Sequence, residues 1–139
     1  MFKKIMVGID GSPQSLRAAK VAGEMGRVMA SDLYLVVVYE PLPHDLGEPF
    51  LQEMLSTRMI EAEKIFNIAL QDCGDIQGKV TKEILEGPPA EAILSVAATR
   101  EADLIIMGTR GLGRIASLFL GSQSMKVVAE AQCPVMLVH

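Results

Sequence analysis

The chain has 139 residues, of which half are hydrophobic and 22% are charged, and its formal net charge is −4. That length suits one domain, residues 1–139, and so much apolar material excludes an intrinsically disordered chain. The acidic balance argues against a general nucleic-acid-binding surface. No apolar run approaches the roughly 20 residues of a membrane helix, the opening residues do not resemble a signal peptide, and two cysteines cannot form a disulfide framework. We therefore expect a cytoplasmic protein that binds neither nucleic acid nor membrane.

Apolar runs alternate with amphipathic segments along the chain. Continuous apolar runs predict buried strands, and apolar residues three and four positions apart predict helices. The expected strands span residues 4–9, 33–39, 79–85, 102–107 and 135–138. The expected helices span residues 13–30, 49–73 and 122–131, with a further helix after Gly87-Pro88-Pro89. This order predicts a three-layer α/β sandwich, with helices on both faces of a mostly parallel, five-stranded sheet.

Two of the expected helices have an apolar stripe that predicts which side faces the core. In the first helix the stripe consists of Leu16, Ala19, Ala22, Met25 and Met29. In the second it consists of Leu51, Met54, Leu55, Ala62, Ile65, Phe66, Ala69 and Leu70. Ser12 and Pro13 are a typical start for the first helix, and Gly74 a typical end for the second.

Ligands of such folds bind at the carboxyl ends of strands, where the strand order reverses. The segment after the fourth strand contains Gly108, Gly111, Gly113 and Gly121. Glycines expose backbone N–H groups that can surround an anion. Ser122 then opens a helix whose N-terminus favours phosphate, and Arg110 and Arg114 add positive charge. The alternative interpretation is a glycine-rich surface turn followed by an ordinary serine cap.

Two common nucleotide motifs do not fit this segment. Residues 111–116 match the dinucleotide pattern G-x-G-x-x-A, but that pattern belongs in the first strand–helix turn, with an acidic residue after the next strand. A P-loop would need Gly-Lys-Ser or Gly-Lys-Thr after the glycines, and neither is present. The segment therefore needs another explanation.

The glycine spacing from Gly108 to Ser122 is G-x2-G-x9-G-[S/T], which resembles the ATP-binding signature of the universal stress protein family. The resemblance extends along the chain. Further matching segments are Val7 to Ser12, Glu86 to Ala90, Ala102 to Gly108 and Pro134 to Val138. It implies strand order 3-2-1-4-5, membership of the ATP-binding subgroup, and a homodimer formed through the last strand, residues 135–138.

The resemblance also implies which residues bind ATP. By its own chemistry, the carboxylate of Asp10 can hold a phosphate-bound Mg²⁺ or accept hydrogen bonds from ribose hydroxyls. Asp10 faces the ribose and adenine side, the backbone of Val38 reads the adenine edge, and the second half of the signature meets the phosphates. The implied binding residues are Gly8, Ile9, Asp10, Val38, Met107, Gly108, Thr109, Arg110, Gly111, Gly113, Arg114, Gly121, Ser122, Gln123 and Ser124. Residues 112–120 would form a flap that the ligand orders.

Several of these residues have an ordinary structural interpretation as well. Asp10 can cap a helix, Gly8 can allow close packing, and Val38 and Met107 can fill the core. No catalytic residue is assigned, because no residue clearly positions a water; Asp10 and Arg110 would support only slow turnover. His44 and His139 are poor general bases, and the two cysteines read as structural.

The sequence thus favours an ATP-binding regulatory protein that acts through nucleotide-dependent conformation or through an unidentified protein partner. One alternative is a slow ATP hydrolase or nucleotidyl-transfer enzyme on the same fold. Another is a module that binds AMP or cyclic AMP, or a nucleotide-free dimeric interaction module.

Overall fold

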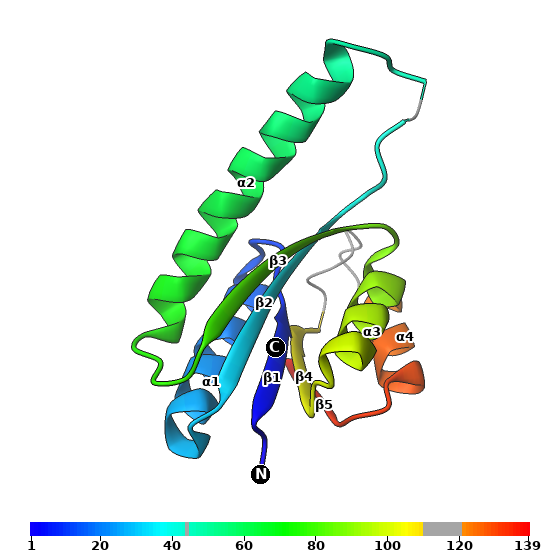
Figure 1. The fold of residues 1–139 in the computed structure, drawn as a ribbon. Helices are drawn as coiled ribbons and strands as arrows, with labels where there is room; N and C mark the ends of the chain where they lie inside the picture. The colour runs from blue at the N-terminus through cyan, green and yellow to red at the C-terminus, as the bar shows by residue number, and fades with distance from the viewer. Residues whose placement is uncertain (44, 110–120) are drawn as a thin grey trace.

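The computed structural model describes residues 1–43, 45–109 and 121–139, and in it strands alternate with helices (Figure 1). The strands are β1 (Lys4–Gly8), β2 (Asp32–Tyr39), β3 (Val80–Glu86), β4 (Leu104–Gly108) and β5 (Val135–Val138). The helices are α1 (Pro13–Met29), α2 (Phe50–Cys73), α3 (Pro89–Arg100) and α4 (Ser122–Glu130). All predicted elements are present, with ends that differ by one or two residues, as is usual for helix and strand boundaries.

The strands form one five-stranded parallel sheet in the order β3-β2-β1-β4-β5. This confirms the predicted order. One hydrophobic cluster lies under α1 and α2, and contains Ile5 and Val7 of β1. A second lies under α3 and α4, and contains Met6 of the same strand. Because successive side chains of a strand point to opposite faces, the predicted three layers follow directly.

The buried face of α1 differs from the predicted stripe. Ala19 and Ala22 are buried as expected, but the long side chains Leu16, Met25 and Met29 are only half-buried. The remaining buried residues are small: Ser15, Ala18, Gly23 and Gly26. The close contact with α2 explains this, because a Cβ atom on Gly23 would lie 2.1 Å from the Cys73 carbonyl oxygen. Only small residues fit between these helices.

The predicted stripe of α2 is correct for its C-terminal part only. Ala62, Phe66 and Ala69 are buried, together with Cys73, which was not in the stripe. Leu51, Met54 and Leu55 are half-buried, because the N-terminal part of α2 extends past the sheet (Figure 1). Periodicity alone gives the apolar side of a helix but not the point at which its partner ends. Among the described residues, no helix is long and apolar enough to span a membrane.

Candidate functional site

The carboxyl ends of β1 and β4 lie side by side in the middle of the sheet. Gly8 pairs with Met107 across these strands and with Val36 of β2. The crossover that leaves β1 lies on the α1–α2 face, whereas the one that leaves β4 lies on the α3–α4 face. This is the switch point at which open α/β sheets bind ligands. The topology therefore brings Asp10, Gly108 and Thr109 to one corner of the molecule.

Asp10 holds the turn between β1 and α1. Its Oδ1 accepts a hydrogen bond from the Ser12 amide at 2.9 Å, and its own amide donates to Ser15 Oγ at 3.2 Å. Ser12 Oγ in turn accepts from the Ser15 amide at 3.2 Å, as expected of the predicted helix cap. Within the described part of the chain, the Oδ2 atom of Asp10 has no hydrogen-bond partner. Asp10 thus stabilises the turn through Oδ1.

Gly108 is a point of close contact between β4 and α1. A Cβ atom at this position would lie 2.8 Å from Gln14 Cβ and 3.0 Å from the Ser15 amide nitrogen. The missing side chain therefore lets the first turn of α1 approach the end of β4. Gln14 and Ser15 therefore lie at the corner, although they are not among the predicted site residues. The predicted helix cap at Ser12 indicates their position, because it places Gln14 and Ser15 in the first turn of α1.

Thr109 connects the two parts of the glycine signature. Its carbonyl accepts a hydrogen bond from the Gly121 amide at 3.0 Å. Its amide donates to the Val138 carbonyl, also at 3.0 Å, and so continues the β4–β5 ladder. The side chain is buried. These bonds hold the start of α4 directly beside the end of β4.

The N-terminus of α4 has the features of an anion site. Its N-cap is Gly121, which has no side chain to cap the helix. Among the described residues, none accepts a hydrogen bond from the amides of residues 122–124. Ser124 Oγ donates to the Gly108 carbonyl at 3.1 Å and is buried, whereas Ser122 is exposed. Uncapped N–H groups and the positive end of the helix dipole favour a negatively charged group here.

The side chain of Gln123 is engaged with another helix. Its Oε1 accepts a hydrogen bond from the Ala90 amide at 3.0 Å, and so caps the start of α3. This bond uses the side-chain oxygen, and the predicted phosphate contact would use the N–H donors of Gln123. The proline at the N-cap of α3 makes no side-chain cap of its own, so Gln123 supplies one from a distant part of the sequence.

The remaining predicted residues differ in exposure. Gly8, Ile9 and Met107 are buried, and the Met107 side chain belongs to the core cluster under α3 and α4. Val38 is half-buried, two residues beyond the last pairing of β2 with β1. Arg110, Gly111, Gly113 and Arg114 lie outside the described residues, as does the predicted flap.

The sequence model of the Universal stress protein family matches residues 1–139. The chain belongs to this family. It is 51% identical to a universal stress protein of Thermus aquaticus over the full length of both chains. It is 34% identical to one of Methanocaldococcus jannaschii, with 99% of this chain and 82% of the relative covered. The family predicted from the glycine spacing and the matching segments is therefore confirmed.

Solved structures of universal stress proteins share this fold. UspA from Lactobacillus plantarum superposes with a TM-score of 0.86 at 23% identity, covering 99% of this chain and 98% of that one. A universal stress protein in complex with cAMP gives 0.75 at 25% identity, covering 99% and 97%. One from Archaeoglobus fulgidus in complex with dAMP gives 0.70 at 19% identity, covering 100% and 98%. Some structural neighbours of this universal stress protein thus bind adenine nucleotides.

Proposed function

We propose that this universal stress protein is a cytoplasmic regulatory protein that binds ATP with Mg²⁺ at the carboxyl ends of β1 and β4. The observation that carries the proposal is the N-terminus of α4, which no described residue caps and which the bond between Gly121 and Thr109 holds beside β4. Gly108 and Gly121-Ser122 occupy positions of the nucleotide signature. The complex of a relative with cAMP supports an adenine nucleotide as the ligand.

The described residues suit a nucleotide and its metal in different ways. The backbone N–H groups of residues 122–124 would bind phosphate oxygens, since a helix N-terminus favours anions. The Oδ2 atom of Asp10 would hold Mg²⁺ or accept hydrogen bonds from ribose hydroxyls, because carboxylate oxygens are ligands that Mg²⁺ prefers. The metal would neutralise phosphate charge. The sequence offers only Asp10 and Arg110 for slow turnover, so we propose binding and not rapid hydrolysis.

Isothermal titration calorimetry with a nucleotide panel tests the proposal. ATP, ADP, AMP and cyclic AMP are titrated into the purified chain, each with and without Mg²⁺. We expect ATP to bind most tightly, with an affinity that Mg²⁺ increases, because the triphosphate reaches the α4 N-terminus. Equal affinity for AMP or cyclic AMP would instead favour the monophosphate alternative, which the cAMP complex of a relative suggests. Absence of binding throughout the panel would leave only an interaction module.

We propose in addition that the chain forms a homodimer through β5. This strand is at the edge of the sheet, pairs with β4 on one side, and has four half-buried residues. An open apolar edge can pair with a second copy of itself. A regulatory protein of this kind would act on a protein partner through a surface that nucleotide binding alters. Hydrogen exchange with and without ATP would locate that surface.

A further inference from the structure

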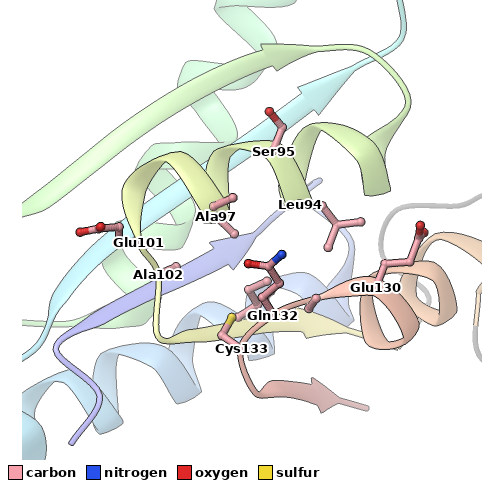
Figure 2. Close-up of a pocket in the computed structure, with 11 residues that line it drawn as sticks. Leu94, Ser95, Ala97, Glu101, Ala102, Glu130, Gln132 and Cys133 are labelled. Carbon is pink, nitrogen blue, oxygen red and sulfur yellow. The ribbon is translucent and has the colours of Figure 1, made fainter.

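A cleft of about 660 Å³ lies between the C-terminal halves of α3 and α4 (Figure 2). It is lined by Ala102 and Ile105, from the amino-end side of β4. Gly108 and Thr109 of the candidate nucleotide site lie at the other end of this strand. The cleft is therefore separate from that site. Its volume falls within the range of small-molecule sites.

The cleft exists because side-chain contacts hold α3 and α4 together near their N-termini, whereas only small residues face each other toward their C-termini. Near their N-termini, Gln123 Oε1 accepts from the Ala90 amide, and Lys126 Nζ lies 2.8 Å from Glu91 Oε1. Toward their C-termini the facing residues are alanines, which are too small to close the space. Those that line it are Ala97, Ala98, Ala102 and Ala131.

The inner wall of the cleft is apolar. Ile105 is fully buried beneath it, and the half-buried Leu94 points into the space between the two helices (Figure 2). Cys133 is also half-buried here. The pKa of its thiol is raised, first by burial and then by the negative charge of Asp103. A raised pKa favours the neutral thiol, which adds to the apolar lining of the cleft.

The ends of the cleft are negative. The C-terminal ends of both helices lie at the border of the cleft, and a helix C-terminus carries the negative end of the helix dipole. Glu101 follows α3 and Glu130 is the last residue of α4, and both line the cleft. The cations on these helices are already paired, Arg100 with Glu83 and Lys126 with Glu91. Among the described residues, Lys4 Nζ donates a hydrogen bond to the Arg100 carbonyl at 3.4 Å, and so places an opposing positive charge at the C-terminus of α3.

We propose that the cleft between α3 and α4 binds a small organic ammonium ion with an apolar body. The apolar body lies against Leu94 and Ile105, and the ammonium group lies toward Glu101 or Glu130. A carboxylate ligand of the same length is rejected, because it would face two helix C-termini and two carboxylates. The charge of the ligand therefore decides binding more than its size does.

Nuclear magnetic resonance of the ¹⁵N-labelled full chain tests the proposal. Hexylammonium chloride and sodium hexanoate are titrated at matched ionic strength. Because such small ligands bind in the millimolar range, the readout is a saturable shift of amide signals. We expect hexylammonium to shift residues 94–102 and 130–133, and hexanoate to leave them unchanged. Equal shifts with both probes, or no saturable shift with either, would overturn the proposal.

The two cysteines give an independent measurement. Methyl methanethiosulfonate is added with and without hexylammonium, and modification of each cysteine is followed by peptide mass spectrometry. We expect hexylammonium to slow modification of Cys133, which lines the cleft. Cys73 is fully buried and serves as an internal control for unfolding. Unchanged reactivity of Cys133 at saturating probe would contradict binding in the cleft.

Substitutions test separately whether binding depends on the open space of the cleft and on its carboxylates. Ala98→Leu fills the cleft at an exposed helix position that accepts leucine well, and should abolish the hexylammonium shifts. Glu101→Gln and Glu130→Gln should each weaken binding by about threefold, the scale of an exposed ion pair. Glu24→Gln, at an exposed position on α1, is the matched control and should leave binding unchanged. Shifts that survive Ala98→Leu would show that the probe binds elsewhere.

Discussion

The amide of Gly121 donates a hydrogen bond to the carbonyl of Thr109 at 3.0 Å. This bond joins two halves of the glycine signature that are separated by eleven residues, 110–120. Because the amide of Thr109 also bonds to Val138, the start of α4 is held to the sheet through one residue. The position of the N-terminus of α4 thus depends in part on backbone hydrogen bonds to β4 and β5.

Gly121→Val should remove nucleotide binding while the fold persists. Gly121 has φ −62° and ψ 149°, a conformation that any residue adopts, so the backbone does not require glycine. A valine side chain would occupy the approach to the amides of α4. We expect ATP affinity to fall by at least about tenfold, and stability to fall by no more than ~1 kcal/mol through the poorer cap. Calorimetry and thermal unfolding measure the two effects.

Gly121→Ser is the control for this substitution. Serine is a good N-cap and adds a smaller side chain, so stability should be retained and affinity should fall less than in the valine variant. Affinity that is unchanged in Gly121→Val would place the phosphates elsewhere.

Ser122 and Ser124 should have opposite roles. Ser122 is exposed at the start of α4, so Ser122→Ala should weaken ATP binding and leave the unfolding free energy unchanged. Ser124 is buried and bonds to the Gly108 carbonyl, so Ser124→Ala should lower the unfolding free energy by about 1–2 kcal/mol. Urea unfolding and nucleotide titration of both variants check this. Equal effects of the two substitutions on stability would contradict the assignment.

The strand order and the family could be predicted because independent signals agree. Continuous apolar runs fix the strands, and Ser12-Pro13 and Gly74 mark helix ends that the structure confirms. The buried face of α1 could not be predicted in the same way. Its small residues follow from the approach of Cys73 to Gly23, a contact between positions fifty residues apart. Hydrophobic periodicity carries no information about how closely two helices approach.

The sequence predicted the location of the candidate site, at the ends of two strands, better than it predicted the contacts of the side chains there. Asp10 and Gly108 lie at the switch point, as expected, but each also has a structural role that the sequence left open. Gln123 fits the signature, yet its side chain caps α3, which begins more than thirty residues earlier. Long-range hydrogen bonds of this kind depend on tertiary packing, and no local pattern encodes them.

Cys73 should make the fold sensitive to alkaline pH. Burial raises the pKa of its thiol from 9.0 to about 11, with a further increase from Asp72 and an opposing effect of Arg27. A pKa that is higher in the folded state stabilises the fold fully below pH 9.0, and this contribution is lost as the pH rises through about 11. Over that range, the wild type should lose on the order of 1–2 kcal/mol more than Cys73→Ala does.

Urea unfolding at several pH values measures this difference. Cys73→Ala also loses the bond from Sγ to the Ala19 carbonyl, so the slopes with pH are compared and not the absolute stabilities. Cys133→Ala is the matched control, and it should have a slope closer to that of the wild type because Cys133 is only half-buried. Parallel curves for the wild type and Cys73→Ala would show that the thiol does not contribute.

Leu137→Pro should dissociate a dimer formed through β5 while the hydrogen bonds between β4 and β5 are kept. Ile105 donates to the Pro134 carbonyl and Thr109 to the Val138 carbonyl. The alternation of a parallel ladder therefore leaves the backbone groups of Leu137 facing away from β4. Proline there removes an outward N–H group, which antiparallel pairing with a second copy would use. We expect sedimentation equilibrium to show a dimer for the wild type and a monomer for the variant. The variant should remain folded but unfold at a lower temperature, because it loses the packing of the Leu137 side chain against the core cluster under α3 and α4. A wild type that sediments as a monomer, or a variant that remains fully dimeric, would exclude this edge as the interface.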